Sequence, residues 1–452
     1  MQDFIGRFKA ILGQDERSRN VNKNSLVIFV CKGITMLISF FLLPLTIGYV
    51  DSETYGIWVT ISSMASWLSI FDIGMGNGFK NKFVECRANG DNIMAQRYVS
   101  TTYGMLSFIF VPLLILFLLA NPFIDWNAIL NINTVEDLHL VFAIVISYFS
   151  LNFILSTINT VLIADQRPGD SSVRMVIQQI VMLVTIIILT KTTEGSLVNL
   201  CLALCLVPLV VILFFNITLF SGRYRDIRPT LKSFDVSLVK DLLSLSLKFF
   251  YLQMVGLILF QITNFIIIHY FSANDVTLYN VAHKYFTLPN GFFVAISTPI
   301  WAAVADALVK KDYKWIQSSL KRYTTILLLF VFGELIMLLV AQPVYNIWMG
   351  DTIDEIPFLV SLFCMLSASV NMSTNIYVSA LCGAGYLKLQ MLFCVISPFA
   401  FIGLCLLFIK VLQWGVWSIL LANLLANIYG VLVAPLQCYL VFFRRKEGIW
   451  NA

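Results

Sequence analysis

Residues 111–120 read VPLLILFLLA, and they lie in a segment, 99–121, that has no charged side chain. A bilayer core about 30 Å thick is crossed by roughly 20 apolar residues in an α-helix. The run also lacks the alternation of apolar and polar residues that a membrane β-strand needs. It therefore predicts a transmembrane helix, and comparable runs recur between residues 24 and 441.

The composition of the whole chain agrees with a membrane protein. Of its 452 residues, 59% are apolar and 12% are charged, against roughly 25% charged residues in soluble domains. A water-soluble fold could not bury that much apolar surface, so we predict an all-α integral membrane protein. Twelve transmembrane helices are expected near residues 24–50, 54–79, 99–121, 136–164, 173–190, 197–220, 242–271, 276–307, 323–345, 357–381, 389–410 and 415–441.

The basic residues predict the orientation of these helices. With twelve spans both termini lie on one side, and that side holds 25 of the 30 Lys and Arg residues. Because cytoplasmic loops are enriched in Lys and Arg, we expect both termini in the cytoplasm. The start of the chain lacks the apolar core of a signal peptide. Residues 4–12 carry apolar side chains on one face, which suits either a helix lying on the membrane surface or a frayed tail.

A weak internal repeat divides the chain at the basic loop 221–240. The segment YVDSETYGIW (49–58) resembles YFSANDVTLYNV (270–281), which follows the seventh predicted helix. Halves with even numbers of helices share one orientation, so we predict two six-helix lobes around a central cleft. The expected parts are a cytoplasmic segment at 1–23, an N-terminal lobe at 24–220, a linker at 221–241, a C-terminal lobe at 242–441 and a cytoplasmic tail at 442–452.

Three predicted helices carry polar side chains on one face, at spacings of three, four and seven residues. Such a stripe should face protein or water rather than lipid, so we expect these helices to line the cleft. The stripes contain Lys32, Thr35, Ser39 and Thr46 in the first helix, Ser62, Ser66, Ser69 and Asp72 in the second, and Asn280, His283, Thr287, Asn290 and Ser297 in the eighth, with Lys284 alongside.

Four ionisable residues inside predicted helices are functional candidates, because charges at membrane depth are costly. Lys284 sits beside His283 on a polar stripe, whereas Lys32 and Lys248 are near enough to the cytoplasmic end to reach the interface. Glu334 lies near the middle of LLLFVFGELIMLLV (327–340). It could carry a coupling proton, or it could be a neutral acid bonded to a neighbouring helix.

Motifs for catalysis and cofactor binding are missing. The chain has no GxxxxGK[ST], HExxH or GxSxG motif, and its nine cysteines form no CxxC pair. We therefore expect no enzyme activity, no cofactor and no metal site. The basic loops, which carry no soluble domain, are explained by orientation and anionic lipid rather than by nucleic acid.

The segment LPLTIGYVDSETYGIWVTISSMASWLSIFDIGMGNGFKNK (43–82) and the turn CGAGYLK (382–388) resemble polysaccharide flippases of the Wzx type. These flippases belong to the multidrug/oligosaccharidyl-lipid/polysaccharide exporter (MOP) superfamily. The resemblance implies ion-coupled, alternating-access movement of undecaprenyl-diphosphate-linked oligosaccharides, such as O-antigen units, across the bacterial inner membrane. It also implies membrane lipid, a polysaccharide polymerase and chain-length proteins as partners.

The resemblance also gives the stripe residues roles. In such proteins a cationic cleft accepts the diphosphate, and here Lys32, Lys248 and Lys284 could supply the cations. The candidate substrate-binding residues are Lys32, Ser39, Ser66, Lys248, Asn280, His283, Lys284 and Asn290, and the candidates for ion coupling are Glu334 and Asp72.

Three other kinds of protein remain alternatives. A cation-coupled multidrug antiporter of the same superfamily would need acidic residues in the cleft, and the N-terminal half has no carboxylate well inside its helices. Lipid II flippases usually have more than twelve helices. A membrane glycosyltransferase or polymerase would need a large outer loop or catalytic carboxylates.

Overall fold

A computed structural model of the chain describes residues 16–72, 75–132, 137–165, 167–240, 242, 261–297 and 300–451. These residues contain helices and connecting turns but no strand. In this part of the chain eight helices are long and apolar enough to cross a membrane, or nine if one bent pair is a single span. The prediction of an all-α membrane protein is confirmed, while the number twelve and the cytoplasmic termini stay predictions. The expected interfacial helix at residues 4–12 and Lys248 lie outside the described residues.

The chain forms two compact units. The first contains residues 1–50, 64–128 and 134–253, and the second contains residues 51–63, 129–133 and 254–452. Residues 51–63 thus belong to a unit that comes otherwise almost entirely from the C-terminal half. The lobes predicted at 24–220 and 242–441 assign this segment to the N-terminal half, and as domains they stay a prediction.

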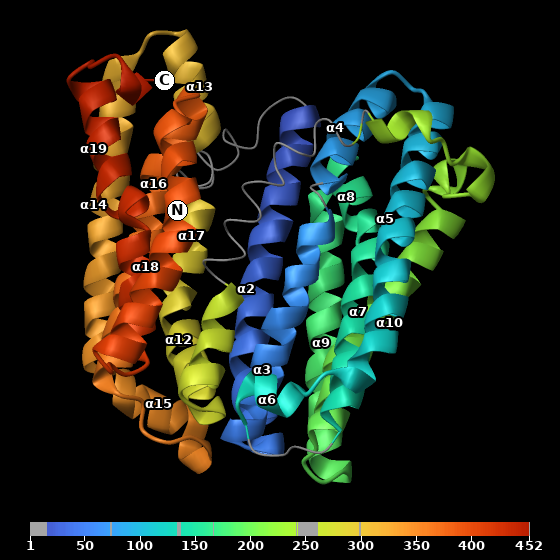
Figure 1. The fold of residues 1–452 in the computed structure, drawn as a ribbon. Coiled ribbons are helices and arrows are strands. Elements are labelled where there is room, and N and C mark those ends of the chain that lie inside the picture. Colours follow the sequence, from blue (N-terminus) through green and yellow to red (C-terminus); the bar gives the residue numbers. More distant parts are fainter. Residues whose placement is uncertain are drawn as a thin grey trace, which may run out of the picture. The chain divides into compact units, whose positions relative to one another are not determined.

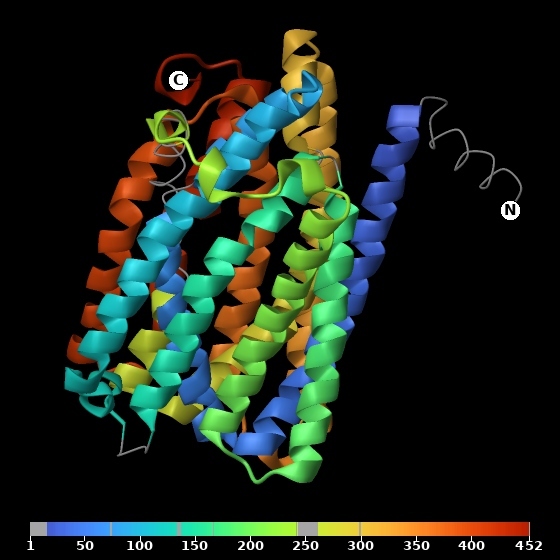
Figure 2. The ribbon, with the colours of Figure 1, turned by 90° about the vertical axis from the view of Figure 1, so that its right-hand side faces the viewer.

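The first unit is a bundle of long helices. In it α2 packs against α9, α10 packs against both α7 and α9, and α7 packs against α5 (Figure 2). The N-terminus of α5 is capped by Asp91, whose Oδ1 accepts a hydrogen bond from the Met94 amide at 2.9 Å. The helices are α2 (Glu16–Val50), α4 (Met75–Ala88), α5 (Asn92–Ala120), α7 (Leu138–Leu155), α8 (Thr157–Ala164), α9 (Pro168–Thr192) and α10 (Leu197–Ser221).

The segment after α10 is attached to α5. Arg97 forms an ion pair with Asp235, and the Asp235 amide donates to Thr101 Oγ1 at 3.1 Å. The Phe234 ring packs directly on Gly104, where a Cβ atom would overlap the ring. Hydrogen bonds from Ser237, together with the Arg97 guanidinium, hold the pKa of Asp235 below its ordinary value.

The second unit is built around α16, which packs against α12, α13, α14, α18 and α19 (Figure 1). The core between them includes Phe293, Met372 and Ile376, all fully buried. The helices are the first part of α3 (Ser52–Ser66), helical residues 261–270, α12 (Ala273–Ser297), α13 (Ile300–Val309), α14 (Tyr313–Leu339), α15 (Ala341–Met349), α16 (Phe358–Ala384), α17 (Lys388–Leu406), α18 (Trp417–Ala426) and α19 (Ala434–Cys438).

Two predicted helices are interrupted within the described residues. The second one changes at Trp67–Asp72 into a 3-10 helix, a form common at helix ends, so Ser69 and Asp72 do not continue the α-helical stripe. The eighth contains α12 and α13, which end and begin on either side of residues 298–299, and these two residues lie outside the described part of the chain. The last one bends by 57° between Ala426 and Tyr429.

A close joint connects α3 to α12 within the second unit. Gly56 lies against the carbonyl group of Ala273, with no room for a Cβ atom. Thr277 Oγ1 donates to the carbonyl oxygen of Ser52 at 2.5 Å, and the Ser52 hydroxyl donates to Asn274 Oδ1. We call this contact the α3–α12 joint. It explains why residues 51–63 belong to the second unit.

Candidate functional site

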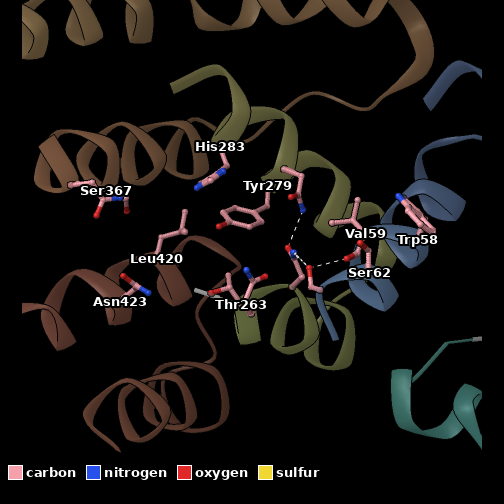
Figure 3. A pocket seen from close by; sticks show the side chains of 14 residues that line it. Trp58, Val59, Ser62, Thr263, Tyr279, His283, Ser367, Leu420 and Asn423 are labelled. Carbon is pink, nitrogen blue, oxygen red and sulfur yellow. Dashed lines mark hydrogen bonds between the residues drawn. The ribbon is translucent and has the colours of Figure 1, made fainter. Parts of the chain in front are cut away.

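The second unit contains a cavity of about 390 Å³, near the lower end of the range for small-ligand sites, roughly 300–1,000 Å³. Five segments line it: α3, helical residues 261–270, α12, α16 and α18. The lining residues are Trp58, Val59, Ser62, Ser63, Gln261, Thr263, Asn264, Tyr279, Asn280, His283, Ser367, Asn371, Leu420 and Asn423 (Figure 3).

The lining is polar but carries almost no charge. It includes five carboxamide side chains and five hydroxyl groups, and among the described lining residues there is no Lys, Arg, Asp or Glu. His283 is the one side chain of this lining whose ordinary pKa lies near neutrality. His283 comes ten residues after the start of α12, which places it about 15 Å along the helix axis. The site therefore offers many hydrogen bonds deep inside a membrane protein.

One chain of hydrogen bonds fixes how two of the amides are oriented (Figure 3). Asn280 Nδ2 donates to the Val276 carbonyl at 2.7 Å and to Asn264 Oδ1 at 2.9 Å. Asn264 Nδ2 in turn donates to Ser63 Oγ at 2.7 Å, and Ser63 donates to the Val59 carbonyl at 2.8 Å. Because a carbonyl only accepts, the Asn280 group that faces the Val276 carbonyl must be its NH₂ group. The same NH₂ group donates to Asn264, so Asn264 must face it with Oδ1 and donate to Ser63 with Nδ2.

Several polar groups of the lining keep free hydrogen-bonding capacity. Among the described residues, Asn280 Oδ1 and the amide groups of Gln261 and Asn371 have no hydrogen-bond partner. The buried Ser367 Oγ likewise has none in the part of the chain that the structure describes. These groups belong to the lining, so the cavity is suited to a ligand that donates and accepts hydrogen bonds.

Two aromatic side chains complete the lining. Trp58 extends from α3 and Tyr279 from α12 (Figure 3). The Tyr279 ring lies 5.5 Å from the His283 ring, measured between centroids. These rings give the polar cavity an apolar surface.

The cavity adjoins a broken helix. Asn423 and Leu420 come from α18, which ends at Ala426 just before the 57° bend. Irregular backbone at membrane depth is tolerated where it is covered by protein or lines a cavity. The break at this position is consistent with a functional site.

Of the predicted site residues, Asn280 and His283 line this cavity. Lys284 follows His283 on α12, is half-buried, and is not among the lining residues. Asn290 lies two turns further along α12, and its buried Oδ1 atom has no hydrogen-bond partner among the described residues. Glu334 is fully buried on α14 and accepts a hydrogen bond from Ser369 of α16.

The remaining predicted site residues lie in the first unit or outside the residues that the structure describes. Lys32 is exposed and Ser39 half-buried on α2, while Ser66 is the last, half-buried residue of α3. The side chain of Asp72 and the whole of Lys248 are outside the described residues. The roles predicted for all of these residues stay predictions.

Sequence reasoning missed most of the lining. Gln261 and Asn264 lie on helical residues 261–270, Asn371 on α16 and Asn423 on α18, and none of these three segments was predicted to line the cleft. A count of Asn and Gln inside the C-terminal spans would have found them. Arg174 was not predicted as a buried group either, yet it lies on α9 and is 7% exposed.

Comparisons with known proteins show what the chain is similar to. A family model described as "Polysaccharide biosynthesis protein" matches residues 21–303. Among solved structures, an inward-facing multidrug resistance MATE family transporter of the MOP superfamily matches with a TM-score of 0.70 and 15% identity, covering 94% of this chain and 96% of that one. The lipid II flippase MurJ in an inward closed conformation matches with a TM-score of 0.72 and 15% identity, covering 95% and 88%. No protein of curated function matches the chain.

Proposed function

The chain belongs to the polysaccharide biosynthesis protein family, and from this membership we propose that it is a flippase for lipid-linked oligosaccharides. The match over residues 21–303 is the observation that carries the proposal. The proposed substrate is an undecaprenyl-diphosphate-linked repeat unit, moved from the cytoplasmic to the outer leaflet of a bacterial inner membrane. A polysaccharide polymerase and chain-length proteins would then use the exported unit.

The transporter fold of the two solved relatives supports a carrier rather than an enzyme. A diphosphate cannot cross hydrocarbon unaided, because desolvating its charges is far too costly. Cationic side chains can replace the lost hydration by charge-assisted hydrogen bonds. We assign this part to Lys32, Lys284 and Lys248, while the lipid tail stays in the bilayer.

Coupling to an ion gradient would reset the carrier. One elementary charge moving through 100 mV supplies about 2.3 kcal/mol, which is enough to bias an equilibrium between two conformations. Glu334 is a candidate for the coupling group, because it is buried at the contact between α14 and α16 and its Oε1 atom has no hydrogen-bond partner among the described residues. Asp72 is the other candidate.

A cation-coupled multidrug antiporter is the alternative, favoured by the similarity to a MATE transporter. A binding site for cationic drugs needs carboxylates, and the described lining of the cavity has none. Glu334 does not line it and is hydrogen-bonded to Ser369 instead. These observations argue against a cationic drug as the ligand of this cavity.

Deletion of the gene in its native host tests the proposal. We expect lipid-linked oligosaccharide to accumulate in the cytoplasmic leaflet and to be restored to the outer leaflet by the wild-type gene. Lys284→Ala should restore it about tenfold less well, since one charge-assisted hydrogen bond is worth roughly 1.5–3 kcal/mol. Lys191→Ala, which removes an exposed lysine at the end of α9, serves as the matched control and should complement fully.

The opposite result would be a normal leaflet distribution in the deletion strain, combined with greater sensitivity to cationic drugs. That outcome would contradict the flippase proposal and support the antiporter. Equal complementation by Lys284→Ala and Lys191→Ala would remove Lys284 from the proposed substrate path.

A further inference from the structure

We infer that the cavity of the second unit binds an uncharged sugar residue of the transported saccharide. This inference rests on the proposed function, and it adds a place and a chemical class for one part of the substrate. It assigns the saccharide and the diphosphate to different groups of side chains. The argument uses the charge, the hydrogen-bonding capacity and the shape of the lining.

The described lining offers an ionised ligand group no permanent counter-charge. Burying a carboxylate or phosphate without a counter-charge is strongly unfavourable. The described lining has no Lys or Arg to pair with an anion and no Asp or Glu to pair with a cation. Lys284, the next residue after the lining His283, is not part of it. The ligand portion that enters should therefore be neutral.

The hydrogen-bonding groups match those of a sugar. Each sugar hydroxyl both donates and accepts, and a carboxamide offers two donors and one carbonyl acceptor. The bonds from Asn280 to Val276 and Asn264 use its NH₂ group and leave its Oδ1 atom as an acceptor of fixed direction. The amides of Gln261 and Asn371, which have no partner among the described residues, add donors and acceptors on other sides.

The aromatic lining favours a ring with an apolar face. Sugar rings carry hydroxyl groups at their edges and C–H groups on their faces, and such faces pack on aromatic side chains. Trp58 and Tyr279 provide those surfaces on two different helices. The volume of about 390 Å³, at the small end of ligand sites, suits a terminal part of the substrate rather than a complete repeat unit.

Binding of short synthetic substrates to the full-length protein in lipid nanodiscs tests this inference. The probes are farnesyl diphosphate and its conjugates with N-acetylglucosamine, galactose or glucuronic acid. We expect at least one neutral conjugate to bind about tenfold more tightly than farnesyl diphosphate, and the glucuronic acid conjugate to show no such gain. Asn371→Leu should abolish the gain, so that the neutral conjugates bind no more tightly than farnesyl diphosphate.

Two controls separate the cavity from the fold and from the proposed function. Asn371 has no partner among the described residues, so its replacement breaks no hydrogen bond there, and Asn346→Leu changes an exposed amide on α15. If the protein binds all probes equally, or if the Asn371→Leu and Asn346→Leu proteins behave alike, the inference is wrong while the flippase proposal stands. If the protein binds none of the probes, the flippase proposal itself fails and takes the inference with it.

Discussion

Arg174 is a buried cation whose hydrogen bonds all go to neutral groups. Its Nε atom donates to Asn159 Oδ1 at 3.0 Å and its Nη1 atom donates to Gln178 Oε1 at 2.9 Å. Among the described residues no carboxylate lies within ion-pair distance of it. The side-chain amides of Asn159 and Gln178 therefore replace the water or carboxylate that commonly accepts hydrogen bonds from an arginine. They stabilise the charge of Arg174 inside the first unit.

Replacement of Asn159 by alanine tests this role. A buried charged donor that loses its acceptor costs roughly 1.5–3 kcal/mol, so we expect Asn159→Ala to lower the thermal midpoint of the purified protein by several degrees. Asn346→Ala, which removes an exposed acceptor of Gln342, should leave the midpoint unchanged. Equal midpoints for the two variants would show that Arg174 does not depend on Asn159.

At the scale of elements, the α3–α12 joint depends on the absence of a side chain. In Gly56→Ala the new Cβ atom would collide with the Ala273 carbonyl group and force the two helices apart. We expect a loss of about 1–3 kcal/mol, the usual cost of overpacking. Gly33→Ala is the matched control on α2, because nothing lies within 4 Å of its added Cβ atom. That change should stabilise the protein by up to about 1 kcal/mol, and the opposite signs can be compared in one unfolding assay.

Attachment of the segment after α10 should depend on pH through Asp235. Its pKa is lower in the folded protein than in the unfolded chain, mainly because Ser237 donates to it and Arg97 lies beside it. The carboxylate therefore stabilises the attached state above its unfolded pKa, and this contribution is lost as the pH falls through the folded pKa. In Asp235→Asn, amide exchange in residues 228–238 should be faster than in the wild type at pH 7, and the difference should shrink as the pH is lowered through the folded pKa of Asp235. A difference that did not change with acidification would point to a cause other than the charge.

Most of the helices could be predicted from the sequence, because hydropathy and length decide them locally. The predicted range 197–220 corresponds to α10, Leu197–Ser221, and the range 357–381 overlaps α16, Phe358–Ala384, except for its first residue. The 3-10 helix after Ser66 and the bend after Ala426 lie inside segments that were each predicted as one continuous span, and hydropathy does not locate such interruptions. Their positions depend on packing against neighbouring helices, and the hydropathy of one segment carries no information about that packing.

The candidate site was less predictable for a related reason. Asn280 and His283 share one helix face and were found by their spacing. Gln261, Asn371 and Asn423 lie on three different helical segments, and only the fold of the second unit brings them to one cavity. Lys284 was expected among them because it neighbours His283, but adjacent residues on a helix point in directions about 100° apart.

At the scale of the whole molecule, the second unit includes a segment from the beginning of the chain. Residues 51–63 are separated in sequence from residues 254–452 by almost 200 positions, yet they belong to the same compact unit. This segment supplies the α3 side of the α3–α12 joint, and it also supplies the lining residues Trp58 and Ser62. The second unit is incomplete without it.

Chimaeras between two members of the family test this dependence. Exchange of residues 242–452 alone should give a protein of low yield that is poorly monodisperse in size-exclusion chromatography, because α3 and α12 then come from different parents. Exchange of residues 51–63 together with 242–452 should restore both yield and function. Equal behaviour of the two chimaeras would mean that the segment is interchangeable.

The same joint has a consequence for how such genes can recombine. A single crossover in the region that encodes residues 221–241 would look harmless, since it falls between two apparent halves, but it would combine the Gly56 surface of one ancestor with the Ala273 surface of another. Viable recombinants would need either matched surfaces at Gly56 and Ala273 or two further crossovers, one before and one after the region that encodes residues 51–63. The short segment would then be inherited with the C-terminal half, although it is encoded near the start of the gene.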